Sequence, residues 1–206
     1  RSWAEQCGSD DSNGRSLWAL GHTVALSDNA DLSQWALGLY RQAAPSFAAM
    51  GSPRTLAFAM LGAAMVLRKH PDDRASLALL ERGGGVLQRL LSWDRSAQWP
   101  WFEDGLGYDN PRLPQALLVA GSALGRQDWM DSALASLRWI STVQVSAQGL
   151  FRPVGSETFG KVGTAMPFDQ QPLEAQAAIE AAESAFRLTG DTFWLDHARA
   201  AWRWFL

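Results

Sequence analysis

Apolar residues recur every three or four positions along most of this chain, the spacing that places side chains on one face of an α-helix. Residues 32–43 show the pattern plainly, with Leu32, Trp35 and Leu39 in register. Residues 54–67 are apolar nearly all round, which predicts a buried helix. The pattern predicts about eight helices, over residues 12–26, 32–44, 53–67, 73–91, 111–125, 129–145, 170–188 and 191–206.

Residues that are preferred at the first and last positions of helices support these ranges. Ser52 and Pro53 are the preferred cap and first residue of a helix, and Gly190 is a preferred helix end. Ser12 or Asp11 would cap the first helix. Three consecutive glycines at 83–85 leave open whether the fourth helix is continuous, because each costs about 1 kcal/mol relative to Ala.

The starts of the odd-numbered helices resemble one another, which indicates a degenerate repeat of helical hairpins. The links within each hairpin are tight turns, whereas two of the links between hairpins are long, at 93–109 and 147–169. In an up-and-down array these long loops, together with the leader 1–11, must emerge at one end. We expect the odd helices to form an inner layer and this end to carry the function.

Composition narrows the function classes. The 206 residues suffice for a single domain over 1–206. The net charge of -3 gives no indication of a surface that binds nucleic acid. The longest apolar run, 56–67, is too short to cross a membrane. The histidines lack zinc-site spacing, no nucleotide-binding motif occurs, and Cys7 has no second cysteine to pair with. We therefore expect a cytoplasmic protein with no cofactor and no metal.

The loop before the fifth helix is the best candidate for chemistry. It reads WPWFEDGLGYDN and places Glu103 and Asp104 beside aromatic residues. Adjacent acids in a loop suit acid/base catalysis or sugar binding. The candidate sugar platform consists of Trp99, Trp101, Phe102 and Tyr108.

Other charged residues stand at helix starts and have two interpretations. Asp11, Asp109 and Asp169 each precede or open an odd helix, so they either cap it or line the site. Glu174 in a first turn either stabilises the helix dipole or contributes to the site. Arg15 and Arg112 either pair with these acids or bind sugar hydroxyls or phosphate, and pairing is favoured. Gln170 and Gln171 complete the candidate binding residues.

Several of these segments together resemble a known family. WPWFEDGLGYDNPRLPQALL, FRPVGSETF and FDQQPLEAQAAI, in this order, resemble a bacterial (α/α) toroid domain found fused to or beside glycosyltransferases. That domain is similar in architecture to six-hairpin glycosidases, whose acids lie on loops at one end of the toroid. The resemblance implies an all-α, (α/α) helical-hairpin toroid that is incomplete here, a fragment of a longer chain with further hairpins upstream.

Two hypotheses for function follow. In the first, the domain acts on a glycosidic bond of an oligo- or polysaccharide, with Glu103 or Asp104 as general acid and Asp109, Asp169 or Asp11 as the partner carboxylate. In the second, a non-catalytic module binds a glycan or a glycosyltransferase partner through the same face. A plain helical scaffold fits less well, because the repeat is longer than 34 residues and the loops are aromatic.

Overall fold

The structure, a computed structural model, describes residues 8–92, 98–159, 161 and 163–206. Predictions that fall on 1–7, on 93–97 or on residues 160 and 162 lie outside this part of the chain. The described residues form α1 (Asp10–Leu26), α2 (Ala30–Ala43), α3 (Pro53–Leu67), α4 (Arg74–Ser92), α5 (Arg112–Leu124), α6 (Gln127–Val143), α7 (Pro172–Thr189) and α8 (Thr192–Arg203), with 3-10 turns η1 (Ala44–Ala49) and η2 (Ser156–Thr158). They contain no strand beyond one bridge between Val145 and Phe151, so the predicted all-α class is confirmed.

The chain divides into two compact units, residues 1–86 and residues 87–206. Each unit contains an odd helix packed on the next odd helix, α1 on α3 in the first and α5 on α7 in the second. Tight hairpins join α1 to α2, α5 to α6 and α7 to α8. This is the predicted arrangement of helical hairpins. The expectation of a single domain over 1–206 stays a prediction.

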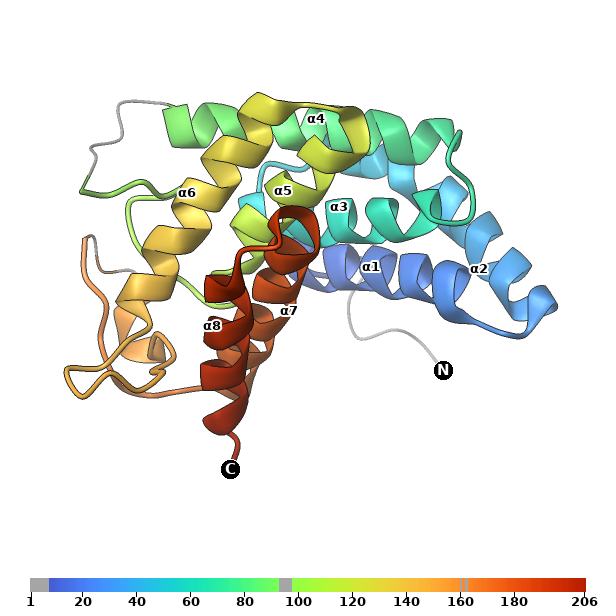
Figure 1. Cartoon of the computed structure of the whole chain (residues 1–206). Helices are drawn as coiled ribbons and strands as arrows, with labels where there is room; N and C mark the ends of the chain where they lie inside the picture. Colours follow the sequence, from blue (N-terminus) through green and yellow to red (C-terminus); the bar gives the residue numbers. More distant parts are fainter. Residues whose placement is uncertain (1–7, 93–97, 160, 162) are drawn as a thin grey trace. The chain divides into compact units, whose positions relative to one another are not determined.

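In the first unit, α1 and α3 lie side by side at very short distance (Figure 1). Gly21 faces Gly62, where a Cβ on either residue would collide with the backbone of the opposite helix. Trp18 stacks on Phe58 beside this contact, with ring centroids 5.7 Å apart. The close approach therefore depends on glycines that the sequence pattern alone did not single out.

One of the three glycines in α4, Gly83, is required by packing. α4 runs without a break from Arg74 to Ser92, so Gly83–Gly85 do not interrupt it. A Cβ on Gly83 would collide with the Sδ atom of Met60 on α3. Burial against α3 therefore offsets the weak helix propensity of glycine.

In the second unit, α5 packs against both α6 and α7, and α7 and α8 lie side by side (Figure 1). Most of α5 is buried, whereas α7 buries an alanine-rich face. In the first unit α3 is buried nearly all round, as predicted. α1 and α2 each bury only one face, and the expectation that the odd helices form an inner layer stays a prediction.

Helix ends agree with the sequence signals in part. Ser52 caps α3 ahead of Pro53, and Gly190 ends α7 with a left-handed backbone. Ser9, not Ser12 or Asp11, caps α1 by accepting a hydrogen bond from the Ser12 backbone N–H. Asp11 lies inside the helix, where its carboxylate favours the dipole.

Candidate functional site

The two long loops of the second unit contact each other. The Gly163 backbone N–H donates a hydrogen bond of 3.1 Å to the Asp104 carbonyl oxygen. The rings of Tyr108 and Phe159 lie 6.0 Å apart between centroids. The two long loops therefore meet, as predicted, whereas the expectation that the leader 1–11 emerges at the same end stays a prediction.

The second loop is folded back on itself. Gly155 N–H donates to the Met166 carbonyl, Ser156 N–H to the Asp169 carbonyl and Glu157 N–H to the Phe168 carbonyl, at 2.8, 2.8 and 3.0 Å. A side chain at Gly155 would collide with the backbone of Phe168, so glycine is required for the pairing. The pairing leaves the side chains of Phe168 and Asp169 exposed to solvent.

A shallow hollow, too small to admit a water molecule, lies where the loops meet the start of α7. Its lining comes from both loops and from the helix, namely Tyr108, Val154, Ser156, Phe159, Gln171, Leu173 and Glu174. Phe159 is 40% exposed and Phe168 is 64% exposed. Phe159 lines the hollow but was not among the residues named from the sequence, although it lies in the segment FRPVGSETF that carried part of the resemblance.

Glu174 is a buried structural residue, not an exposed ligand of substrate. Its carboxylate accepts hydrogen bonds from the Asn110 backbone N–H at 3.1 Å, from Asn110 Nδ2 at 2.8 Å and from Gln144 Nε2 at 3.2 Å. Glu174 is 2% exposed and Asn110 is completely buried. The network joins α7 to the turn that leads into α5 and to the end of α6.

Asp109 does not cap a helix. α5 begins at Arg112, and the residue before it, Pro111, supplies no side-chain cap. Asp109 has a left-handed backbone with φ of 55° and is 2% exposed. Its Oδ1 lies 3.4 Å from Arg112 Nε, an ion pair buried at both ends. Left-handed residues other than glycine are uncommon, and aspartate is among the types that tolerate the conformation.

Arg112 is also buried and paired with other protein side chains. Its Nη1 donates to Glu180 Oε2 at 2.6 Å and to Gln115 Oε1 at 2.9 Å, and its side chain is 2% exposed. The pairing interpretation, favoured over binding of sugar or phosphate, agrees with this arrangement. Arg112 thus links α5 to α7.

The predicted aromatic platform is mostly core. Trp101 and Phe102 are 0% and 1% exposed, and Trp101 packs against Trp139 at 5.6 Å between ring centroids. Trp99 is half-buried against Trp139, and its Nε1 donates to the Glu103 carbonyl at 2.8 Å. Trp101 and Phe102 therefore offer no face to a sugar, because packing in this unit covers both rings. Tyr108 is half-buried at the hollow.

Three predicted acids remain accessible in the second unit. Asp104 and Asp169 are exposed, and Glu103 is half-buried in the loop that Trp99 braces. Asp169 does not cap α7, since Gln171 precedes the helix and makes no side-chain cap either. Of the two glutamines, Gln171 lines the hollow. Gln170 is engaged instead, accepting a hydrogen bond of 2.8 Å from Trp204 Nε1.

Asp11 and Arg15 belong to the first unit, where they pair with each other. Arg15 Nε lies 2.9 Å from Asp11 Oδ2, one helical turn apart on α1. The Arg15 guanidinium also lies over the Phe58 ring, 4.1 Å from its centroid. Asp11 and Arg15 are thus held by contacts within the first unit.

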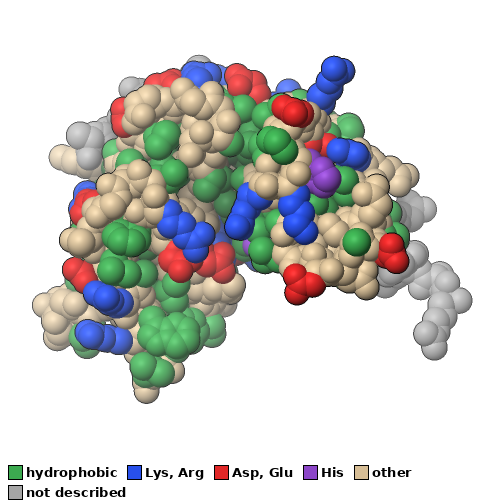
Figure 2. Space-filling model, turned by 45° about the vertical axis from the view of Figure 1, so that its right-hand side comes forward, with side chains coloured by type: hydrophobic (Ala, Val, Ile, Leu, Met, Phe, Trp, Pro, Cys, Tyr) green, Lys and Arg blue, Asp and Glu red, His purple; other side chains and the backbone are tan. Residues whose placement is uncertain are grey.

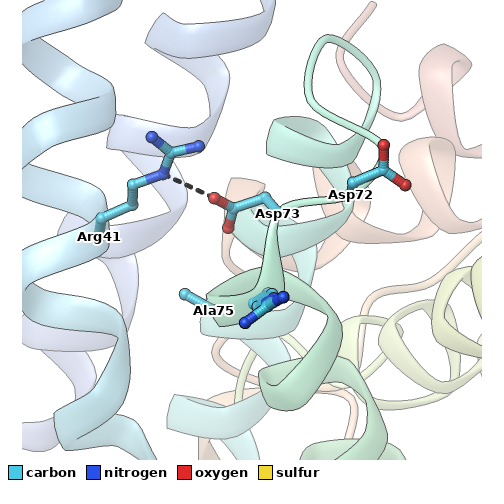
Figure 3. A pocket seen from close by; sticks show the side chains of 5 residues that line it. Arg41, Asp72, Asp73 and Ala75 are labelled. Atoms are coloured by element: carbon cyan, nitrogen blue, oxygen red, sulfur yellow. Dashed lines mark hydrogen bonds and ion pairs between the residues drawn. The ribbon is translucent and has the colours of Figure 1, made fainter.

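The first unit has an open pocket of about 430 Å³ at the start of α4, lined by Arg41 and residues 72–75 (Figure 3). Arg41 Nε points at Asp73 Oδ1 across 2.6 Å, while the Asp72 carboxylate is turned away (Figure 3). Burial opposes ionisation of Asp73, but hydrogen bonds from Arg41 and Ser76 hold its pKa below the usual value. Asp73 also accepts from the Ser76 backbone N–H at 3.0 Å. These contacts assign Asp73 to capping α4.

Neither the surface charges nor clusters of metal-ligating side chains indicate a further site in the described residues. Side chains of both charges are scattered over the face visible in Figure 2. Within the described part of the chain, no three His, Cys, Asp or Glu residues cluster as metal ligands would. None of the described helices is long and apolar enough to cross a membrane.

Comparison with known proteins supplies a fold but no family. Neither protein-family models nor curated sequences match the chain. Among solved structures, the crystal structure of an unsaturated glucuronyl hydrolase specific for heparin is similar, with a TM-score of 0.71 and 15% sequence identity. The similarity covers 93% of this chain and 55% of the hydrolase chain, so this chain spans about half the length of that structure. The fold of this chain is thus that of part of an (α/α) toroid.

Proposed function

We propose that this chain is part of a carbohydrate-active domain that acts on a glycosidic bond at the end of the second unit where the two long loops meet. The observation that carries the proposal is the hydrogen bond from Gly163 to Asp104. It joins the loop that bears Glu103 and Asp104 to the loop that bears Asp169. The fold similarity to a glycoside hydrolase gives this surface its chemical context.

Cleavage of a glycosidic bond needs a proton donor and a second carboxylate on either side of the bond. Glu103 is the first donor candidate, because it is half-buried in the loop whose Glu103 carbonyl accepts a hydrogen bond from Trp99. Asp104 is the second candidate. Asp169, exposed on the facing loop, is the partner carboxylate. Asp109 and Glu174 take structural roles in this scheme, because their carboxylates are buried among protein groups.

The test is turnover of a panel of oligosaccharides by the protein and by Glu103→Gln, Asp104→Asn and Asp169→Asn. General acid catalysis contributes about 10²–10⁴-fold in rate, so the donor variant should lose that factor while it still binds glycan. Glu183→Gln on the exposed face of α7 is the matched control and should behave as wild type. Full turnover by all three loop variants would rule out this assignment.

A second candidate function is a non-catalytic module that binds a glycan or a glycosyltransferase partner. It is favoured by the burial of Asp109 and Glu174, two predicted site acids, in contacts that hold the fold. Under this hypothesis no member of the panel is turned over, and the loop variants change affinity alone.

A further inference from the structure

Large hydrophobic side chains are exposed on the first and the last helical hairpins of the described chain. Those that lie inside helices are Leu26, Leu32, Trp35, Leu39, Leu188 and Trp202. The first four belong to the hairpin of α1 and α2, and the last two belong to the hairpin of α7 and α8. Among their described residues, α3, α4, α5 and α6 expose none. The hydrophobic surface of the helices is therefore concentrated on the two hairpins at the ends of the series, and α2 carries most of it.

The exposed residues of α2 form one stripe along the helix. Leu32, Trp35 and Leu39 are separated by three and four positions, so they share a face. Trp35, the largest of them, is 60% exposed. A different face of α2 is tied to the start of α4, where Ser76 Oγ donates a hydrogen bond of 3.0 Å to the Tyr40 hydroxyl. The stripe is thus separate from the face of α2 that already has a neighbouring helix.

The stripe continues into an apolar groove between α1 and η1. Ala43 follows Leu39 by four positions and Trp35 by eight, so it lies on the same face of α2. Ala43 borders a groove of about 230 Å³, whose described lining includes no charged side chain. The other apolar residues that line the groove are Leu17, Leu20, Phe47 and Met50. An apolar space of about 150 Å³ holds a benzene ring, so this groove has room for a large apolar side chain.

Gly38, one helical turn from Trp35, has an open side where other helical glycines have a neighbour. At those other positions an atom of a neighbouring element lies within 3.0 Å of the place where a Cβ would be, namely at Gly14, Gly21, Gly62, Gly83 and Gly121. At Gly38 nothing lies within 4 Å of that place, although glycine weakens a helix relative to alanine. The backbone of a helix packed beside Trp35 would occupy this space, as α3 does beside Gly21.

The architecture indicates what kind of element covers this face. The terminal units of a helical array need a polar outer face to stay soluble, whereas the stripe on α2 is apolar. In a closed toroid each hairpin packs between two others, and this chain spans about half the length of the similar hydrolase. A neighbouring hairpin therefore accounts for the stripe, the groove and the open side of Gly38 together.

We propose that Leu32, Trp35 and Leu39, with the groove that borders Ala43, dock a helix of a further hairpin that this protein carries outside residues 1–206. The backbone of that helix passes close to Gly38, and one of its large apolar side chains fills the groove. The surface lies in the first unit and uses none of the loop residues assigned to cleavage of a glycosidic bond. It therefore stands or falls independently of the proposed function.

The experiment compares residues 1–206 with the complete polypeptide that the gene encodes. Leu39→Cys is introduced into both proteins, and the rate at which a maleimide labels the thiol is followed by mass spectrometry of the peptides. We expect labelling to be at least about tenfold slower in the complete polypeptide, because docking covers the stripe. Gln34→Cys, which is exposed on another face of α2, is the matched control and should be labelled at the same rate in both.

Gly38→Ala provides a second measurement, with opposite signs in the two proteins. It should raise the melting temperature of residues 1–206, because alanine favours the helix. In the complete polypeptide it should lower the melting temperature, because the methyl group meets the docked helix.

Three results would overturn the proposal. The first is equal labelling of Leu39→Cys in the two proteins. The second is protection in residues 1–206 alone that disappears on dilution, which would assign the face to a second copy of the chain. The third is a gene that encodes no helical hairpin beyond these residues.

Discussion

The Asn110 side-chain amide donates a hydrogen bond of 2.8 Å to Glu174 Oε1, between residues 64 positions apart in the chain. The Asn110 backbone N–H donates to the other carboxylate oxygen at 3.1 Å. One buried carboxylate thus fixes both the side chain and the backbone of the turn before α5. Through that turn α7 positions Tyr108, which borders the hollow.

Glu174→Ala should destabilise the protein by about 3 kcal/mol, because it leaves the buried amide donors of Asn110 and Gln144 without their acceptor. Chemical denaturation followed by circular dichroism measures the change. Glu183→Ala, which breaks an exposed ion pair on the same helix, should cost less than about 0.5 kcal/mol. Equal effects of the two substitutions would contradict the structural role of Glu174.

Gly21→Ala should destabilise the first unit, although alanine favours helix by about 1 kcal/mol over glycine. The new methyl group would collide with the Gly62 backbone and force α1 away from α3. Gly38→Ala in α2 is the matched change, since nothing lies within 4 Å of its Cβ position. Gly38→Ala should stabilise the protein by about 0.5–1 kcal/mol. Thermal unfolding should therefore show a lower melting temperature for Gly21→Ala and a higher one for Gly38→Ala.

Trp101→Ala should reduce stability by about 3–5 kcal/mol, the cost of removing a large buried side chain. Trp101→Phe should cost much less, because it keeps most of the packing. It also removes an indole N–H that has no hydrogen-bond partner among the described residues. A Trp101→Ala variant with wild-type stability but lost glycan binding would place Trp101 in the site after all.

His197 should make stability depend on pH. Burial lowers its pKa from 6.5 to about 4, against Phe151 and Phe193. Between these pH values the unfolded chain binds a proton that the folded chain does not, so stability falls as pH decreases from about 6.5 towards 4. The slope approaches about 1.4 kcal/mol per pH unit. In His197→Leu the free energy of unfolding should depend less on pH between about 4 and 6.5. Denaturation curves of the wild type and the variant at several pH values in that range measure the difference.

The sequence by itself determined the helices and how they are joined. Apolar spacing, Ser52 with Pro53 and Gly190 act within a few residues, so local physics suffices to place those helices and their ends. The contrast between tight turns and long loops also predicted which loops meet. These features require no knowledge of what each helix packs against.

Only the tertiary structure decided which site candidates are accessible. Trp101 and Phe102 look like a platform in the sequence, yet α6 supplies Trp139 to cover Trp101. Glu174 reads as a first-turn acid, yet its partner Asn110 lies 64 residues away. Burial and pairing depend on residues distant in sequence, and a pattern read over one or two helical turns contains no information about them.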